Sequence, residues 1–310
     1  MSFKRPDIIR PPSEAGSYFL PFTSGCSHNS CGFCNFYGCQ LQIRNLDEIK
    51  KEIDALAAFT NQGLQTAGQP SIVYYIANEW DGRRIFLQDG DALVYPYDDM
   101  VTALQYLNAK LPHVERIASY TTTQDILRLS VDKLKTLREL KLGILYLGVE
   151  SGDDQILKQI NKGVTARQII EAGQMIKAAG ILSSVTVLLG LGGPTRSQEH
   201  ALATAKILTD LDPDYAGALT LTLVPGTPMD QAFQKGEFQL ISPMQSLQEL
   251  QWIIRNSKFT HSFFSSMHAS NYLSLRGTLP NDKENILHQL DYVLHSADNS
   301  LLRPEYMRGL

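Results

Sequence analysis

Three cysteines, Cys26, Cys31 and Cys34, lie within nine residues of each other near the N-terminus. Thiolates are soft ligands that suit iron–sulfur clusters and zinc. Three thiolates can hold a 4Fe-4S cluster and leave one iron without a protein ligand, which makes that iron a place for chemistry. The spacing of these residues therefore predicts an iron–sulfur site with one open coordination position.

Two other kinds of site compete for these cysteines. A structural zinc ion could be bound by the three thiolates and His28, but zinc sites usually combine two separated ligand pairs, and no second pair follows. Disulfides would close only one short loop, because all four cysteines lie between positions 26 and 39 of a 310-residue chain. Zinc stays open as the weaker alternative. The fourth cysteine, Cys39, is expected to be inert, since nothing near it marks an activated thiol.

The run from Phe22 to Gly38 resembles the cluster loop of the radical S-adenosylmethionine (SAM) superfamily. The commonest loop in that family reads C-x3-C-x2-C, with an aromatic residue just before the last cysteine. Here the first spacing is one residue longer, and Phe33 fills the aromatic position. The longer loop contains His28 and Asn29, to which the sequence gives no firm role. The resemblance implies that the three cysteines bind a 4Fe-4S cluster, that SAM is the second cofactor, and that Phe33 lies in the cofactor site.

The segment from Gly148 to Gly152 is the most distinctive stretch after the cysteines, and it follows an apolar strand-like run. It resembles the Gly-x-Glu-Ser-Gly segment of radical SAM enzymes related to oxygen-independent coproporphyrinogen III oxidase, the methylthiotransferases and the elongator-type catalytic subunit. The resemblance implies that Glu150 contacts SAM at the ribose, with Ser151 beside it. A carboxylate that accepts hydrogen bonds from paired hydroxyls makes physical sense of this position, because charge-assisted hydrogen bonds are strong.

Other predicted strand ends carry further positions that the resemblance assigns to SAM. Gly90 and Asp91 stand where the family has a Gly-Gly-Glu-like motif for the amino group, although an ordinary Asp-Gly turn explains them equally well. Gly190 and Gly192 would let the backbone approach the adenine or the methionine carboxylate closely. Val224 ends the sixth strand, where its backbone would face the adenine.

These motifs are distributed along a chain in which predicted strands and helices alternate about six times. The expected strands are 17–23, 84–87, 117–120, 144–149, 182–189 and 216–224. The expected helices are 47–59, 98–111, 131–140, 153–160, 165–179 and 195–210, with an extra helix or insertion at 71–81. The alternation predicts an α/β fold, a partial (β/α)6 TIM-type barrel with a parallel sheet. Chemistry in such barrels lies at the C-terminal ends of the strands, where the motifs occur.

Beyond residue 235 the alternation stops, and we expect two domains, a barrel over 1–235 and a mainly helical C-terminal extension over 236–310. Helices are expected at 242–255 and 282–295. The run 260–280 is so rich in polar groups that it is either exposed or built around a ligand. A surface connection is one interpretation. In the other, four side chains face the barrel mouth and act on the substrate: His268, Asn271, Tyr272 and Arg276.

Composition limits the classes of partner. With 43% hydrophobic residues and a net charge of −4, the chain is typical of an ordinary soluble protein. It has neither a signal-peptide-like start nor an apolar run of membrane-spanning length, so we expect a cytoplasmic protein with no membrane partner. It lacks a basic run, and a nucleic-acid partner is therefore not expected. The expected partners are a small-molecule substrate and an electron donor such as flavodoxin or ferredoxin.

The family resemblance also implies a reaction. One electron from the cluster cleaves SAM to methionine and a 5'-deoxyadenosyl radical, which removes a hydrogen atom from the substrate. Only Cys39 is left over, too few ligands for the second cluster of methylthiotransferases, and no cobalamin-binding signature occurs. The expected protein is a single-cluster enzyme that acts on an unidentified small molecule, with oxidation as the first reaction to consider and lyase or isomerase chemistry as others. The hypothesis from another class is a non-catalytic iron–sulfur or haem-handling carrier.

Overall fold

The computed structural model describes residues 3–35, 37–296 and 298–309. The chain divides into two compact units that interleave along the sequence. Unit 1 comprises Met1–Asn29, Phe36–Tyr146 and Met175–Leu182, and unit 2 comprises Ser30–Asn35, Leu147–Gln174 and Ser183–Leu310. The cysteine-rich loop therefore contributes Cys26 to unit 1 and both Cys31 and Cys34 to unit 2.

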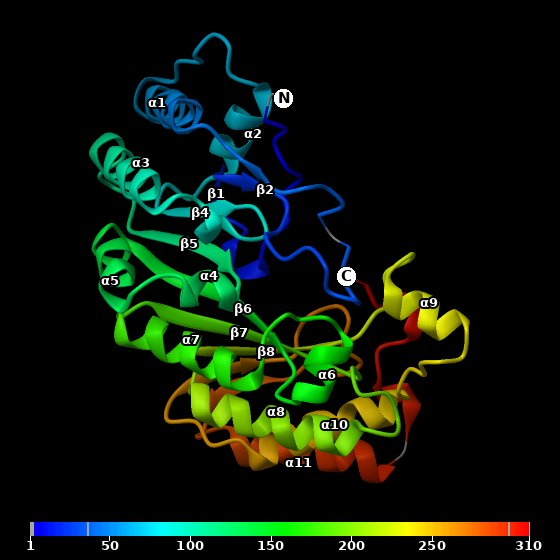
Figure 1. Cartoon of the computed structure of the whole chain (residues 1–310). Helices are drawn as coiled ribbons and strands as arrows, with labels where there is room; N and C mark the ends of the chain where they lie inside the picture. The colour runs from blue at the N-terminus through cyan, green and yellow to red at the C-terminus, as the bar shows by residue number, and fades with distance from the viewer. Residues whose placement is uncertain (1–2, 36, 297, 310) are drawn as a thin grey trace. The chain divides into compact units, whose positions relative to one another are not determined.

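Unit 1 is built on parallel strands that carry helices (Figure 1). Its strands are β1 (Tyr18–Pro21), β4 (Arg84–Gln88), β5 (Arg116–Thr121) and the first half of β6 (Leu142–Glu150), with a small antiparallel pair, β2 (Thr23–Ser24) and β3 (Gln42–Ile43). Its helices are α1 (Leu46–Gln62), α2 (Ser71–Glu79), α3 (Tyr97–Lys110), α4 (Thr123–Leu127) and α5 (Val131–Glu139). Tyr18 pairs with Ile85 and Arg84 with Arg116, which fixes the parallel register of β1, β4 and β5.

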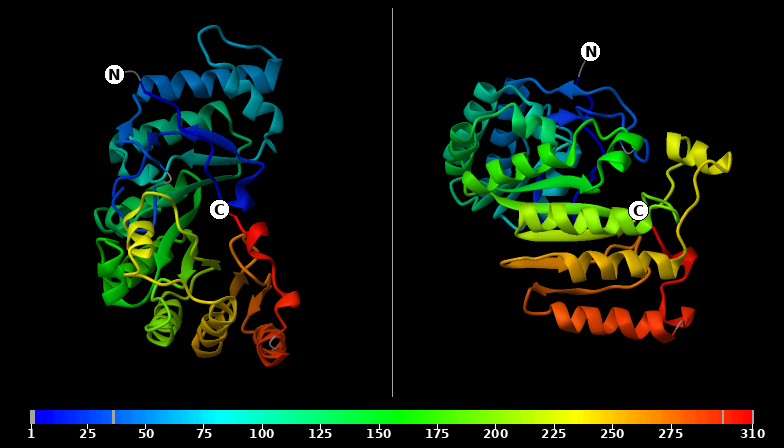
Figure 2. Two further views of the ribbon diagram at one scale, coloured as in Figure 1. Left: turned by 90° about the vertical axis from the view of Figure 1, so that its right-hand side faces the viewer. Right: turned by 60° about the horizontal axis from the view of Figure 1, so that its bottom comes forward.

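Unit 2 continues the pattern of parallel strands and adds a terminal hairpin. Its strands are β7 (Leu182–Leu189), β8 (Tyr215–Thr220), β9 (Ser262–Ser265) and β10 (Arg276–Leu279), and β9 and β10 are antiparallel. Its helices are α6 (Asp154–Gln159), most of α7 (Ala166–Ala178), α8 (Ser197–Leu211), α9 (Pro228–Gln234), α10 (Pro243–Asn256) and α11 (Lys283–Ser296). Helices α8, α10 and α11 pack side by side, and Figure 2 shows them end-on in a row.

The sheet order confirms the predicted fold class. Among the described residues, eight strands are hydrogen-bonded in the order β1-β4-β5-β6-β7-β8-β9-β10, and the pairs from β1 to β5 and from β7 to β9 are parallel. The strands β1, β4 and β6 are almost continuously buried, as expected where helices cover a parallel sheet, whereas β7 and β8 alternate between buried and more exposed residues over most of their length. The predicted insertion at 71–81 is the helix α2. The predicted boundary between domains 1–235 and 236–310 stays a prediction.

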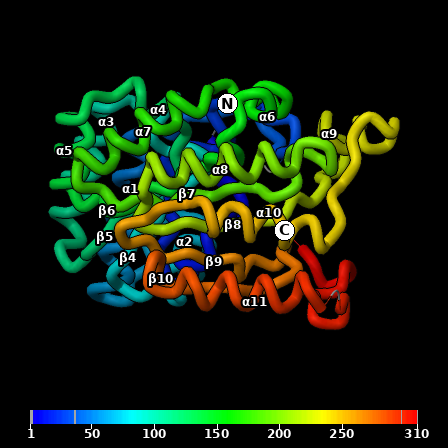
Figure 3. The backbone as a smooth tube through the Cα atoms, turned by 90° about the horizontal axis from the view of Figure 1, so that it is seen from below, coloured from blue at the N-terminus to red at the C-terminus, as the bar shows by residue number. Residues whose placement is uncertain are grey.

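Three details of the secondary-structure prediction are wrong. The sixth strand ends at Thr220 rather than at residue 224, because Thr220 pairs with Leu189, the last residue of β7, and no neighbouring strand continues beyond it. The helix expected to begin at residue 195 begins at Ser197 (α8), with Arg196 as an N-cap that lacks a side-chain hydrogen bond. The strands β9 and β10 were not predicted, and Figure 3 shows them beside α11.

The part of the chain that the structure describes contains no helix with both the length and the apolar character needed to cross a membrane.

Candidate functional site

The first part of the cysteine loop is held by carboxyl groups in unit 1. Gly25 has a left-handed φ of 95°, and its N–H donates to Oδ2 of Asp89 at 3.0 Å. On the other side of Cys26, the hydroxyl of Ser27 donates to Asp91. Both neighbours of Cys26 are therefore fixed by acids that lie just after β4.

Asp91 belongs to a wider network in unit 1. The Ser27 hydroxyl also contacts Oδ2 of Asp125 at 3.0 Å, and Asp125 pairs with Arg128. Asn29, whose role the sequence left open, donates from its side-chain amide to the Cys39 carbonyl at 3.0 Å. This bond joins the start of the loop to its end.

Asp89 and Asp91 each keep one carboxyl oxygen without a partner. Both residues are buried, and Oδ1 of each makes no hydrogen bond within the described residues. Burial raises the pKa of each carboxyl to about 6, although the Gly25 N–H opposes the change at Asp89 and the Ser27 hydroxyl opposes it at Asp91. A buried acceptor that lacks a donor is costly, so two such oxygens beside the loop suit a ligand that brings donors, such as an ammonium group.

The second part of the loop is held by backbone hydrogen bonds in unit 2. The Gly32 N–H donates to the Ile160 carbonyl at 2.7 Å, and the Gly32 carbonyl accepts from the Met229 N–H at 2.9 Å. The Asn161 side-chain amide donates to the Ser30 carbonyl at 3.0 Å. The end of α6 and the start of α9 thus fix the segment that carries Cys31 and Cys34.

The four cysteines are half-buried, and each carries its thiol outside any disulfide. Within the described residues, no group of three or more histidine, cysteine, aspartate or glutamate side chains is gathered as a ready metal site. The donor set itself still fits a cluster, because three thiolates within nine residues are the ligands that an iron–sulfur cluster requires. Phe33, between Cys31 and Cys34, is also half-buried.

Glu150 ends β6 in a constrained conformation. Its φ is 62°, and its Oε1 accepts from the Nζ of Lys162 at 2.9 Å in a pair whose side chains are only 10% and 15% exposed. A Cβ at Gly148 would lie 2.1 Å from this Oε1, so only glycine lets the carboxylate fold back along the strand. The position of this carboxylate therefore depends on Gly148 as well as on Glu150.

Lys162 and Asn161 are functional candidates that the sequence did not identify. The Asn161 side chain contacts the cysteine loop, and the Lys162 side chain contacts Glu150. Asn161 has a left-handed φ of 51°, typical of asparagine at a helix end. The one hint in the sequence is that Lys162 follows the candidate acid Glu150 by twelve positions. This spacing does not show that the chain turns back and brings the two side chains together.

Ser151 contacts a fully buried histidine. Its hydroxyl lies 2.8 Å from Nδ1 of His200, while Nε2 of His200 lies 2.9 Å from the Leu188 carbonyl. A carbonyl only accepts, so Nε2 carries the hydrogen and Nδ1 accepts from Ser151. Burial lowers the pKa of His200 to about 4, partly opposed by the bond to Leu188, and the ring is neutral near pH 7.

Gly190 contacts a fully buried acid. Its N–H donates to Oε2 of Glu249 at 2.7 Å, and the Ser197 hydroxyl donates to Oε1 at 2.6 Å. Burial raises the pKa of Glu249 to about 7. Gly190 has a φ of 89°, and a Cβ at Gly192 would lie 2.8 Å from the Arg196 carbonyl, so both glycines are required by the turn. His200 and Glu249 were not predicted as site residues.

Val224 is half-buried, and its carbonyl accepts from both the N–H and the hydroxyl of Thr227, the N-cap of α9.

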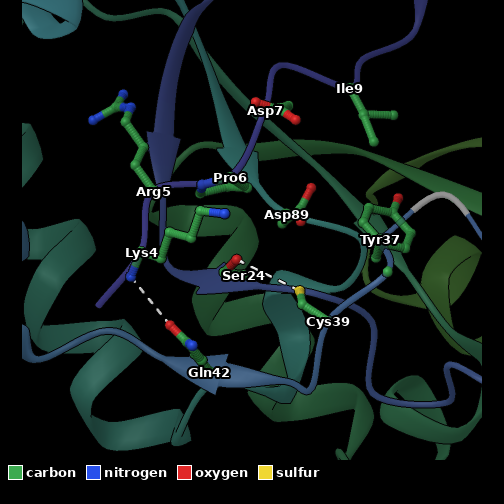
Figure 4. Close-up of a pocket in the computed structure, with 11 residues that line it drawn as sticks. Lys4, Arg5, Pro6, Asp7, Ile9, Ser24, Tyr37, Cys39, Gln42 and Asp89 are labelled. Atoms are coloured by element: carbon green, nitrogen blue, oxygen red, sulfur yellow. Dashed lines mark hydrogen bonds between the residues drawn. The ribbon is translucent and has the colours of Figure 1, made fainter. Parts of the chain in front are cut away.

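A pocket of about 170 Å³ lies within unit 1 (Figure 4). Its lining includes Lys4, Asp89 and Cys39. The Cys39 sulfur lies 3.9 Å from the Ser24 hydroxyl, as Figure 4 shows. Cys39 therefore borders a cavity, and its expected inertness stays a prediction.

The four candidate substrate residues lie close together in the chain but in different surroundings. The amide of Asn271 is buried and donates to the carbonyls of Ala218 and Ser266 at 2.7 and 2.9 Å. The Tyr272 hydroxyl donates to Glu305 at 2.8 Å. These two side chains are thus occupied in holding their own loop.

His268 is half-buried and its Nδ1 lies 2.9 Å from the Ser270 hydroxyl; burial, with Arg303, lowers its pKa. Arg276 is exposed at the start of β10. The role of His268, Asn271, Tyr272 and Arg276 in a reaction stays a prediction.

Comparison with known proteins identifies the family. The sequence model of the radical SAM superfamily matches residues 20–207. The tRNA-2-methylthio-N(6)-dimethylallyladenosine synthase of Methylobacillus flagellatus is 24% identical over 253 residues, which cover 79% of this chain and 53% of the synthase. The heme chaperone HemW of Bacillus subtilis is 23% identical over 244 residues, which cover 78% of this chain and 59% of HemW. The chain thus spans only somewhat more than half the length of these relatives.

Solved structures share the fold. One is the radical SAM methyltransferase TsrM of Kitasatospora setae, solved with cobalamin and a [4Fe-4S] cluster bound. Its superposition has a TM-score of 0.53 at 18% identity and covers 71% of this chain and 40% of the TsrM chain. Coproporphyrinogen III oxidase (HemN) of Escherichia coli gives 0.50 at 20% identity and covers 76% and 50%. These matches confirm the predicted α/β fold of the TIM-type partial barrel.

Proposed function

Since the chain belongs to the radical SAM superfamily, we propose that it is a single-cluster enzyme that cleaves SAM reductively and removes hydrogen from a small-molecule substrate. The family uses a 4Fe-4S cluster and SAM. When bound, the cluster would supply one electron that breaks the S–C5' bond of SAM, giving methionine and a 5'-deoxyadenosyl radical able to take a hydrogen atom from the substrate. The observation that carries the proposal is the support of the cysteine loop, whose residues on both sides of Cys26 are held by buried carboxyl groups.

The proposed cluster ligands are Cys26, Cys31 and Cys34. The protein's task is to hold this loop in one conformation, so that the thiolates meet the cluster together and leave one iron for SAM. The Gly32 hydrogen bonds to Ile160 and Met229 support this role, because they restrict the backbone between the second and third thiolates.

Two sets of acids are proposed to orient SAM. Glu150, fixed by Lys162, would accept from the ribose hydroxyls. The unpartnered oxygens of Asp89 and Asp91 would accept from the amino group. The proposed supporting positions are Phe33, Gly90, Ser151, Gly190, Gly192 and Val224.

The number of cysteines limits the class of reaction that we propose. Beyond the three proposed ligands this chain has only Cys39, which is too few for a second cluster on the chain. Hydrogen abstraction without a second cluster is therefore favoured over methylthio transfer, and oxidation is the first reaction to test. Flavodoxin or ferredoxin would supply the electron.

The test is SAM cleavage by the anaerobically reconstituted protein. A brown protein that absorbs near ~400 nm is expected for a cluster, whereas a colourless protein with bound zinc would contradict it. On reduction with dithionite we expect release of 5'-deoxyadenosine, measured by chromatography, and none from Cys34→Ala. An intact cluster in a protein that releases no 5'-deoxyadenosine, with or without candidate substrates, would rule out the enzyme.

A second candidate is a haem-handling carrier, and the similarity to the heme chaperone HemW favours it. A carrier would bind haem with a characteristic absorption band and would not turn over SAM. Titration with haem, next to the cleavage assay, separates the two functions, because an enzyme without haem affinity and a haem-binding protein without cleavage give opposite results.

A further inference from the structure

A carboxylate on α10 supports the turn that follows β7. Glu249 is fully buried, and its two oxygens accept from the Gly190 N–H at 2.7 Å and from the Ser197 hydroxyl at 2.6 Å. Gly190 has a φ of 89°, a backbone conformation that residues with a side chain rarely adopt. The direction of the chain after β7 is thus set by a side chain that lies beyond residues 20–207, the part that the family model matches.

A second buried group joins the ends of β6 and β7. His200 accepts from the Ser151 hydroxyl and donates to the Leu188 carbonyl. Thr204, one turn later on α8, accepts from the Gly152 N–H at 3.2 Å. The segment after β6 packs closely against α8, because a Cβ at Gly152 would lie 2.1 Å from the Ala203 carbonyl oxygen.

The burial of Glu249 and His200 excludes direct contact with a substrate. Both are 0% exposed, and their hydrogen bonds all end on the chain's own groups. What they contact are the residues beside Glu150 and the turn from Gly190 to Gly193. A group that touches only these segments acts on a ligand through them.

We propose that Glu249 is a positioning residue for SAM. It holds the Gly190 backbone in place, and His200 holds Ser151 in place in the same indirect way. This inference rests on the proposed function, because it takes the Gly190 turn and Glu150 as parts of the SAM site. It adds a residue of α10 that neither the motifs nor the comparisons assign.

The two-sided hydrogen bonding of Glu249 allows a sharp choice of variants. In Glu249→Gln the amide oxygen can still accept from Gly190, and the amide NH₂ can donate to the Ser197 hydroxyl, which rotates to accept. In Glu249→Leu the volume is similar but the buried Gly190 N–H loses its acceptor, and the turn must move to find another. Ser197→Ala is the matched control, since it removes a bond to the same carboxylate and leaves Gly190 untouched.

The experiment measures SAM binding to the reconstituted full chain by equilibrium dialysis without reductant, so that no turnover occurs. We expect Glu249→Leu to raise the dissociation constant at least about tenfold. Glu249→Gln and Ser197→Ala are expected to stay within about threefold of the wild type. If Glu249→Leu does not fold, Glu249→Asp replaces it, because its shorter side chain withdraws the carboxylate from Gly190, and the same loss is expected.

Two results would overturn the inference. One is a folded Glu249→Leu protein whose SAM dissociation constant rises by less than about tenfold. The other is an equal loss in Ser197→Ala, which would indicate general loosening of α8 and α10. The change that SAM causes in the electron paramagnetic resonance spectrum of the cluster gives a second readout. A wild type that binds no SAM would instead refute the proposed function, so the two failures are distinguishable.

Discussion

Glu249 and His200 lie 3.9 Å apart, and burial moves their pKa values in opposite directions. The pKa of Glu249 rises from 4.5 to about 7, so its contribution to stability is full at low pH and is lost as the pH rises toward 7. The pKa of His200 falls from 6.5 to about 4, so its contribution is full above pH 6.5 and is lost as the pH falls toward 4. Between these values the two groups oppose each other.

Single substitutions should expose the two opposed slopes. Glu249→Gln removes the Glu249 contribution, so from pH 6.5 to pH 5 its free energy of unfolding should fall by roughly 2 kcal/mol relative to the wild type. His200→Asn removes the His200 contribution, so from pH 5 to pH 7 its free energy of unfolding should fall by roughly 2 kcal/mol relative to the wild type. Urea unfolding followed by circular dichroism gives the slopes. Two variants whose slopes match that of the wild type would contradict this coupling.

Gly148 offers a direct test of the Glu150 carboxylate. In Gly148→Ala the new Cβ would lie 2.1 Å from Oε1, so the carboxylate must leave Lys162 and its place beside the strand. We expect the SAM dissociation constant to rise about tenfold. Gly217→Ala on β8 is the matched control, because its new Cβ would lie 3.8 Å from the Val185 carbonyl oxygen, an ordinary contact distance. Equal SAM binding in both variants would argue against a role for Glu150.

Among the secondary-structure elements, the connection between α6 and α7 has the clearest functional position. It carries Asn161 against the Ser30 carbonyl and Lys162 against Glu150. Helix α6 begins after its N-cap Asp153, and α7 follows the reciprocal Thr165–Gln168 capping box, in which each side chain accepts from the backbone N–H of the other residue. Because both helix starts are fixed, the short connection has little freedom and can support the cysteine loop.

Changing Asn161 should loosen the cysteine loop without breaking this turn. Asn161→Gly keeps the left-handed conformation but loses the bond to Ser30, and Asn161→Asp places a carboxylate against the same carbonyl. We expect both variants to lose iron faster than the wild type on exposure to a chelator, with Asn161→Asp the faster of the two. Absorption near ~400 nm follows the loss. Rates equal to that of the wild type would show that the loop does not depend on this contact.

The sequence predicted the elements better than their contacts. The helices expected at 165–179 and 131–140 are present as α7 and α5, and each begins with a local pattern, the Thr165–Gln168 capping box or the Ser130 N-cap. The strands β9 and β10 were missed because they are four residues long and polar in part, and tertiary pairing decides such segments. His200, Glu249 and Lys162 could not be predicted, since their partners are distant carbonyls, amides and acids that only the fold brings near.

For the molecule as a whole, the number of clusters separates the possible reactions. The chain covers 53% of the methylthio synthase to which it is similar, and it contains four cysteines in all. Three of them lie on the loop that the buried carboxyl groups and α9 support, and Cys39 lies beside the Ser24 hydroxyl in the pocket of unit 1. A chain of this composition can supply ligands for one cluster.

Iron content therefore distinguishes Cys39 from the other cysteines. We expect about four iron atoms per chain in the reconstituted wild type and the same in Cys39→Ala, because three thiolates are enough for one 4Fe-4S cluster. Cys31→Ala should lose most of its iron, since two thiolates cannot hold the cluster against a chelator. Iron and sulfide analysis, with the absorption spectrum, gives the comparison. Equal iron loss in Cys39→Ala and Cys31→Ala would make Cys39 a ligand, and the single open iron on which the proposed chemistry depends would then be occupied by the protein.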